Sequence, residues 1–385
     1  MKKRFLILVL VVVLALSLGA SAVYANIALF IDGARQNPTV APVVQDGVTL
    51  VPLRLISETL GADVSWNAGT RQATITTAGY NVVFTIDSQS FTVNGATRSL
   101  VSPARLINNS TMVPIRAFAE SIGATVNFNE ATNTATVDYF TTMTGTLNIS
   151  GSTTVQPIVQ GAADKIMGMN RGLNITVAGG GSGTGIRDAS AGTVHIGMSS
   201  REFTAEERSA LNIYAVALEG IAIIAHPSNP VQNLTVEQAA EIFLGGNRNW
   251  NAVGGNNAPI LVTTRETGSG TRATFEELLL NRESVIESAA PFGSSALIMQ
   301  AVAREANAVG YVSMGYLDST VKAVTLDGVA ATAATVVDAS YALGRNLYVC
   351  TSGRPTGVAA IFIDYLRSAD VQRNIVVQEG YIQLR

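Results

Sequence analysis

The chain has 385 residues, of which 47% are hydrophobic, and carries a formal net charge of −3. This length allows two or three domains with sizeable cores, and the acidic balance argues against general binding of nucleic acid. The only cysteine, Cys350, excludes an internal disulfide and a thiolate metal cluster, and its apolar neighbours predict a buried, unreactive thiol.

Residues 1–25 have the pattern of an export signal peptide. Three basic residues at positions 2–4 precede an apolar run from Phe5 to Leu18, and small residues follow as far as Ala25. The run is short for a membrane-spanning helix. We predict cleavage after Ala25, with a retained anchor as the alternative. The mature chain, with net charge −6 once the three basic residues are removed, is then exported to the extracellular face of the membrane or the cell envelope.

Residues 26–140 contain an internal repeat with an offset of 62 positions. The segment VPLRLISETLGA from Val51 recurs as VPIRAFAESIGA from Val113. Each copy predicts a short helix that starts near its proline and ends at a left-handed glycine, Gly61 or Gly123, before a hairpin. Between the copies, residues 81–86 and 90–93 alternate like antiparallel strands.

This repeat resembles the small stalk-like module at the start of some bacterial copper amine oxidases and many Gram-positive surface proteins. The module has no histidine or cysteine here, so imidazole and thiolate ligands for copper are missing. Arg54 and Glu58, four residues apart, predict a structural ion pair on a helix. We expect this small α+β domain to serve as a spacer or to associate with the cell wall.

Residues 141–146 read as a linker, after which strand-like and helix-like segments alternate in an α/β pattern. Three of the junctions are turns rich in glycine and hydroxyl residues: SGSTT from Ser150, GGGSGTG from Gly179, and GSGT within the run RETGSGTR from Arg265. Each turn follows a strand and opens a helix, where unpaired backbone N–H groups favour an anion. Arg265 adds a guanidinium fork. The sequence therefore predicts that three helix starts converge on one oxyanion.

Together with a fourth segment, Thr193 to Arg201, these turns resemble the phosphate-binding protein of the bacterial phosphate ABC transporter. The resemblance covers about residues 145–385 and implies an α/β, two-lobed type II periplasmic-binding-protein fold with the anion in the cleft. The phosphate-binding domain would span 147–385. Lobe one would comprise 147–225 and 346–385, and lobe two 226–345.

Carried over residue by residue, the resemblance implies a set of phosphate-binding groups on the four motifs. Thr153 and Thr154 come from the first turn, Ser182 and Gly183 from the second, and Ser200 from the fourth segment. The third motif supplies four more: Arg265, Ser269, Gly270 and Thr271.

Position 200 departs from some members of the family, which place an aspartate there to accept the proton of HPO₄²⁻ and reject sulfate. A serine can donate or accept, so the choice among tetrahedral anions stays open at this point. The neighbouring Arg201 either adds positive charge or pairs with an acidic neighbour such as Glu202 or Glu206. Glu266 and Asp188 are candidates to brace an arginine, and Arg272 is suited to pair with Glu276 on its helix.

On this resemblance we expect a receptor that captures inorganic phosphate and passes it to an ABC transporter permease, without a cofactor, a metal ion or a catalytic residue. The alternatives are a cell-surface phosphate sensor or scavenger and a receptor for sulfate or molybdate. A phosphatase using the same anion cradle is disfavoured, because no Ser-His-Asp set or metal cluster accompanies the turns. A dinucleotide site is disfavoured too, because the glycines at 181, 183 and 185 do not keep the required interval.

Overall fold

The computed structural model describes residues 27–384, so the predicted signal peptide lies outside the described residues. The chain forms two compact units, one built from residues 27–58, 63–76 and 80–139 and the other from 59–62, 77–79 and 140–384. Across residues 27–384, none of the helices has the length and apolar character needed to cross a bilayer.

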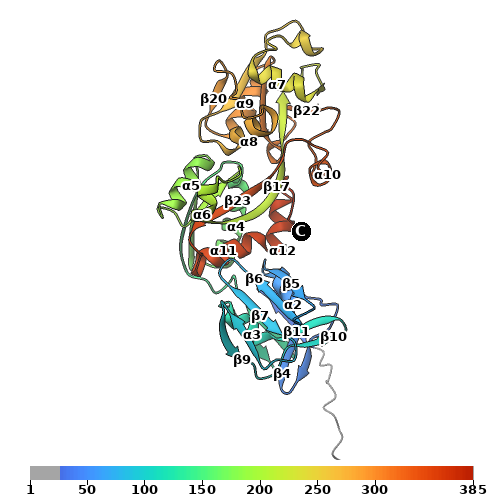
Figure 1. The fold of residues 1–385 in the computed structure, drawn as a ribbon, viewed down its shortest axis with the longest axis vertical. Coiled ribbons are helices and arrows are strands. Elements are labelled where there is room, and N and C mark those ends of the chain that lie inside the picture. The colour runs from blue at the N-terminus through green and yellow to red at the C-terminus, as the bar shows by residue number, and fades with distance from the viewer. Residues whose placement is uncertain (1–26, 385) are drawn as a thin grey trace, which may run out of the picture. The chain divides into compact units, whose positions relative to one another are not determined.

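The first unit consists of short strands and two helices, drawn in blue to cyan in Figure 1. The first copy of the repeat contains β1 (Ala28–Ile31), β2 (Ala34–Gln36), β3 (Val43–Gln45), β4 (Val48–Pro52), α2 (Leu53–Thr59), β5 (Asp63–Asn67) and β6 (Gln72–Thr76). After β7 (Asn81–Thr85), the second copy contains β8 (Ser90–Val93), β9 (Ala96–Ser99), β10 (Arg105–Ile107), β11 (Ser110–Pro114), α3 (Ile115–Ser121), β12 (Thr125–Asn129) and β13 (Thr134–Asp138).

The two copies are related by an approximate twofold axis between β4 and β11. These strands pair antiparallel with Val51 opposite Val113, its equivalent in the other copy. Each helix ends as predicted at a left-handed glycine, with φ of 77° at Gly61 and 89° at Gly123. The predicted ion pair on the first helix forms between Arg54 and Glu58 at 3.5 Å. The two copies of the sequence repeat therefore form a structure with approximate twofold symmetry.

The second unit alternates strands and helices. Its first part contains β14 (Gly145–Gly151), α4 (Gln156–Met169), β15 (Leu173–Gly179), α5 (Ser182–Ser190), β16 (Ile196–Ser199), α6 (Ala205–Ala210) and β17 (Leu211–Ala225). Its middle contains β18 (Asn233–Leu234), α7 (Val236–Leu244), η1 (Trp250–Val253), β19 (Leu261–Arg265), α8 (Gly270–Leu279), β20 (Ala290–Phe292), α9 (Ser295–Arg304), β21 (Ala308–Ser313), η2 (Met314–Tyr316), β22 (Lys322–Leu326) and α10 (Ala333–Val337). Its end contains β23 (Gly344–Ser352), α11 (Gly357–Arg367), α12 (Ala369–Val371) and η3 (Gln372–Val376).

These strands form one continuous sheet in the order β15-β14-β16-β23-β17-β21-β19-β20. We call β14, β15 and β16 with their helices the first half, and β19, β20 and β21 with theirs the second half. The long strand β17 joins them: it pairs with β23 as far as Gly220 and with β21 from Ile221 onward. Figure 1 shows the two halves at opposite ends of β17. The change of partner lies within β17, between Gly220 and Ile221, so this strand itself connects the two halves.

Each half has its own apolar core. In the first half, Ile186 and Phe203 pack with Cys350, whose thiol is buried as predicted. Burial raises the pKa of this thiol to about 12, so it stays protonated and unreactive at neutral pH. In the second half, Phe275 stacks on Tyr311 with ring centroids 3.9 Å apart. Packing in these cores fixes the helices on the sheet and so fixes the positions of their N-terminal ends.

A buried ion pair lies where β17 and β23 run side by side. Glu219 stands opposite Arg345 in the strand register, and their side chains are 0% and 5% exposed. The Arg345 Nε donates to Glu219 Oε1 at 2.7 Å, and Ser313 of β21 donates to the other carboxylate oxygen. Burial outweighs the attraction of Arg345 and raises the pKa of Glu219 to about 7.

This shift predicts a pH dependence of stability. The unfolded chain has an ordinary glutamate pKa of 4.5, so between that pH and about 7 the folded chain binds more protons. The contribution of Glu219 to the free energy of unfolding is then full below pH 4.5 and lost as the pH rises through about 7. Urea unfolding of the ligand-free protein across this range should show wild type losing stability relative to Glu219→Gln as the pH rises. Parallel curves for the two proteins would contradict the shift.

Candidate anion-binding site

The three predicted turns open three helices of the second unit. β14 leads into α4, β15 leads into α5, and β19 leads into α8. Left-handed glycines make two of the turns possible, with φ of 84° at Gly181 and 94° at Gly268. Ser269 is the N-cap of α8 and accepts the backbone N–H of Arg272. The first N–H groups of each helix and the positive end of its dipole therefore face the turn residues.

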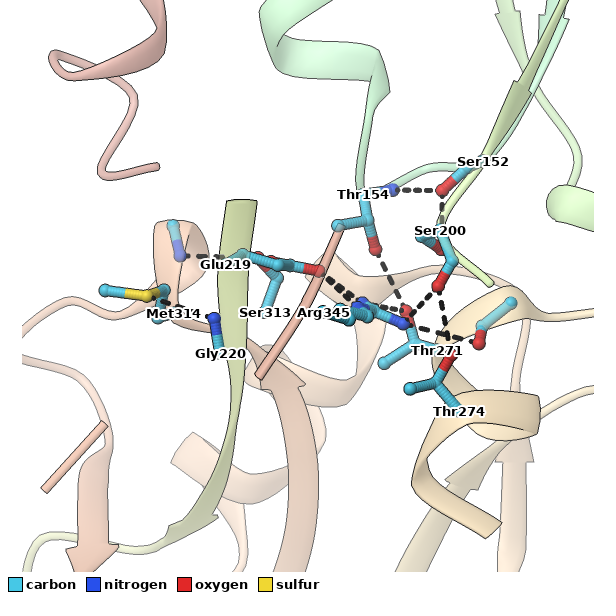
Figure 2. A network of polar contacts seen from close by, with 12 residues as sticks. Ser152, Thr154, Ser200, Glu219, Gly220, Thr271, Thr274, Ser313, Met314 and Arg345 are labelled. Atoms are coloured by element: carbon cyan, nitrogen blue, oxygen red, sulfur yellow. Dashed lines mark hydrogen bonds and ion pairs between the residues drawn. The ribbon is translucent and has the colours of Figure 1, made fainter. Parts of the chain in front are cut away.

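The hydroxyl groups of these turns meet. Thr154 Oγ1 lies 2.9 Å from Thr271 Oγ1, which joins the start of α4 to the start of α8 (Figure 2). Ser182 Oγ lies 3.3 Å from Ser200 Oγ and accepts the Ser200 backbone N–H at 2.9 Å. All four side chains are at most 1% exposed. Four of the predicted ligands thus form one buried cluster built by both halves.

Two glycines of the site allow close packing between the halves. A Cβ atom on Gly270 would lie 2.1 Å from Ser182 Oγ and 2.7 Å from Ser200 Oγ, so only glycine fits beside these hydroxyls. The predicted ligand Gly183 donates its N–H to the carbonyl of Gly268 at 3.0 Å. In this arrangement that N–H holds the two halves together, whereas the sequence analysis expected it to point at the anion.

Arg265 lies at the end of β19 and is 1% exposed. Its Nε donates to the carbonyl of Phe292 at 3.0 Å, and its Nη2 donates to the carbonyl of Gly293 at 3.1 Å and to Glu266 at 2.9 Å. One Nη1 hydrogen goes to Ser295 Oγ at 3.3 Å. Of the five donors of a guanidinium, one Nη1 hydrogen remains to be directed at an anion.

Two of the ion pairs expected near the site form, and the third candidate carboxylate has other partners. Glu266 braces Arg265, and Arg272 pairs with Glu276 at 2.7 Å, as the sequence suggested. The candidate Asp188 instead accepts from Ser150 and pairs with Arg187, so it braces no arginine of the cluster.

Arg201 is paired and turned away from an anion role. It forms a two-pronged ion pair with Glu207, with both contacts at 2.8 Å. Pairing with an acidic neighbour is therefore confirmed, although the carboxylate is that of Glu207 rather than of Glu202 or Glu206. Arg201 also donates to the backbone carbonyl of Glu202. The Arg201 guanidinium holds the pKa of Glu207 below its usual value.

Three contacts to the first turn were missed in the sequence. Ser152 Oγ accepts the N–H of Thr154 at 3.2 Å and donates to Ser200 Oγ at 2.9 Å, which links two motifs. Tyr316 and Tyr381 donate to the carbonyls of Thr153 and Thr154 at 2.7 and 2.8 Å. Ser152 could have been recognised as a hydroxyl residue of its turn, next to the predicted Thr153 and Thr154, but the tyrosines lie far along the chain and carry no local signal.

Arg345 is the other residue that the sequence did not identify as part of the site. Its Nη1 donates to the carbonyl of Ser200 at 2.6 Å and its Nη2 to Thr271 Oγ1 at 3.0 Å, as Figure 2 shows. The same Nη1 lies 3.3 Å from the carbonyl of Gly270. One side chain at the strand crossing therefore touches two predicted ligands and the backbone of a third.

Chemically, the cluster is a set of buried N–H and O–H donors with the braced guanidinium of Arg265 beside it. Such a set of donors matches a tetrahedral oxyanion, because most or all of the anion's oxygens carry no proton and accept hydrogen bonds. Within residues 27–384, no group of three or more His, Cys, Asp or Glu side chains is placed to hold a metal ion.

Comparisons with known proteins agree with this chemistry. Residues 129–370 match the PBP superfamily domain and residues 30–137 match the copper amine oxidase N-terminal domain. A phosphate-binding protein PstS of Bacillus subtilis is 37% identical over 244 residues, which cover 62% of this chain and 80% of that protein.

Solved structures agree as well. A putative phosphate ABC transporter substrate-binding protein from Clostridium perfringens, with bound phosphate, is 36% identical with a TM-score of 0.60, over 63% of this chain and 100% of that one. An ABC-type phosphate transport receptor from Vibrio cholerae is 33% identical with a TM-score of 0.54, over 62% and 99%. These matches confirm the predicted fold class and both predicted resemblances. The chain belongs to the PBP superfamily and, within it, to the family of PstS phosphate-binding proteins.

Proposed function

We propose that this protein captures inorganic phosphate between the two halves of its second unit and delivers it to an ABC transporter permease. The observation that carries the proposal is the buried hydroxyl cluster beside three helix starts. In it, Thr154, Ser182 and Ser200 come from the first half and Thr271 comes from the second. The relatives named above bind phosphate or serve phosphate transport, which supports the same ligand here.

The two halves correspond to the lobes that we propose for a clamshell receptor. An exposed helix end contributes only about 0.3–1 kcal/mol to holding an anion in water, so tight binding needs many donors acting together after water is excluded. Closure of the halves over the ion supplies that condition. The ligand set of this proposal is the predicted one, namely Thr153, Thr154, Ser182, Gly183, Ser200, Arg265, Ser269, Gly270 and Thr271. To bind the anion, the N–H of Gly183 would have to leave the carbonyl of Gly268.

Ser200 gives this site a neutral group where some relatives have a carboxylate. Its Oγ accepts from Ser152, and a second lone pair is available for the proton of HPO₄²⁻. We propose that this acceptor favours phosphate over sulfate, which has no proton to donate. Because a serine lacks the negative charge that would repel sulfate, the preference should be smaller than a carboxylate would give.

Calorimetric titration of the mature chain, freed of co-purified ligand, tests the proposal. We expect one phosphate per chain and a preference for phosphate over sulfate and molybdate. Arg265→Lys should weaken binding by about tenfold or more, because it keeps the charge but loses the fork. Lysine is the better substitution, since Arg265→Ala would also release the carbonyls of Phe292 and Gly293. Tighter binding of sulfate or molybdate would show that the protein is a receptor for a different anion. Unchanged phosphate affinity in Arg265→Lys would show that the anion binds elsewhere.

A phosphatase built on the same cradle is the enzymatic alternative. The relatives are named as binding proteins and receptors rather than as enzymes. We propose that this chain has no catalytic role either. Incubation with a chromogenic phosphate ester should therefore give no turnover above that of Arg265→Lys. Clear turnover in wild type that Arg265→Lys removes would overturn the receptor proposal.

We also propose that the protein works outside the cytoplasm, after export by its N-terminal signal. We propose that the first unit has a separate binding role there, and the structure of its twofold repeat supports this role. Each copy forms a groove in which a half-exposed aromatic side chain lies beside an arginine: Trp66 with Arg54, and Phe128 with Arg116. The grooves have volumes of about 330 and 590 Å³.

The two grooves are equivalent in detail, because most of their lining residues are related by the 62-residue offset, and each is completed by a hairpin of the other copy. An aromatic ring can stack on the apolar face of a sugar, while arginine and backbone groups hydrogen-bond its hydroxyls. Two related grooves, although they differ in volume, suit a polymer with a repeating unit. We therefore propose that residues 26–140 associate with cell-wall glycan, which would make the protein a wall-held phosphate scavenger as well.

Sedimentation of the mature chain with purified cell wall tests this role. Trp66→Ala together with Phe128→Ala should reduce the bound fraction by about tenfold, while phosphate affinity stays unchanged because neither residue belongs to the hydroxyl cluster of the second unit. Leu297→Ala, which removes another side chain that is 44% exposed, is the matched control and should bind like wild type. Equal sedimentation of all three proteins would leave residues 26–140 as a spacer.

A further inference from the structure

The ion pair of Glu219 and Arg345 lies behind the proposed phosphate site, and its geometry gives it a function. Both residues belong to strands shared by the two halves, β17 and β23. The Arg345 fork reaches Ser200 of the first half at 2.6 Å and Thr271 of the second at 3.0 Å. Separation of the halves must break one contact or the other. Arg345 is therefore a bridge that is complete only when the cleft is closed.

The bridge also fixes the direction of a ligand hydroxyl. Since Arg345 Nη2 donates to Thr271 Oγ1, the hydrogen of that hydroxyl points away from the guanidinium, toward Thr154 or an anion. On the first half, the Ser200 carbonyl accepts from Arg345 and from Thr274 Oγ1 at 3.2 Å, which anchors the loop that carries the Ser200 hydroxyl. One guanidinium thus orients groups on opposite sides of the site.

Glu219 keeps the bridge in place rather than adding charge. It takes the Nε of Arg345 at 2.7 Å and is itself held by Ser313. When Glu219 is ionised the pair is neutral overall, so its effect on an anion then comes through geometry more than through net field. A lone substitution of either residue would leave the other buried charge without a partner and would destabilise the fold for that reason alone.

We propose that Arg345, held by Glu219, is a positioning residue that couples closure of the two halves to the orientation of Thr271 and Ser200. The inference rests on the proposed phosphate-binding function. It predicts that loss of the bridge leaves the encounter with phosphate intact but shortens the lifetime of the closed complex. The dissociation rate constant should rise while the association rate constant changes little.

The test uses Arg345→Met together with Glu219→Gln, which removes both charges and all Arg345 donors while keeping a group that can face Ser313. Lys165→Gln with Asp370→Asn, an ion pair outside the cluster joined at 2.7 Å, is the control. Thermal unfolding without ligand shows whether each variant is folded, and stopped-flow measurements with inorganic phosphate give the two rate constants. We expect a folded Arg345 variant whose dissociation is faster by about tenfold or more, and a control that matches wild type.

Two further variants separate positioning from simple support. Arg345→Lys keeps the charge but not the fork, so it should also dissociate faster. In a Thr271→Val background the Arg345 and Glu219 substitutions should have a smaller effect, because the hydroxyl they orient is gone. Wild-type dissociation in the folded Arg345 variant, or full additivity with Thr271→Val, would overturn the inference and leave the proposed function standing. Failure of wild type to bind phosphate would overturn both.

Discussion

The second unit depends on two strands that both of its halves share. β17 pairs with β23 over most of its length and then continues into the second half beside β21. β14, β15 and β16 lie on one side of this strand pair in the sheet, and β19, β20 and β21 lie on the other. Relative movement of the halves must therefore twist or bend this short two-strand connection, and groups that sit on it feel the movement first. Glu219 and Arg345 are such groups, which explains why a buried ion pair is placed there rather than in either core.

Much of the candidate site could be predicted from sequence because its parts are local. A strand, a glycine and hydroxyl turn, and a helix start lie within about 20 residues of one another, and backbone chemistry decides what such a junction can bind. Arg265 was found for the same reason, since it directly precedes its turn. The recurrence of three such turns predicted that they converge on one anion, and the family resemblance added Ser200 from the fourth segment.

Arg345 was not predicted as a site residue because its contact partners lie far from it in the sequence. Its contacts to Thr271, Gly270, Glu219 and Ser200 span 74, 75, 126 and 145 residues. A lone arginine before an apolar strand has no pattern that separates it from a surface residue. The partners of Asp188 and Arg201 show a related limit: the sequence offers several opposite charges near each of them, and only packing decides that Asp188 pairs with Arg187 and Arg201 with Glu207.

The first unit has a different logic, in which one sequence pattern is used twice. Its copies meet through β4 and β11, with Val51 opposite Val113 on the symmetry axis, and each groove borrows a hairpin from the other copy. A single copy would leave one of these strands as an open, apolar sheet edge, which invites aggregation. It would also keep only part of each groove. The smallest piece that gene duplication or deletion could add or remove as a folded part is therefore the pair, so natural variation in the length of such a stalk should occur in steps of two copies.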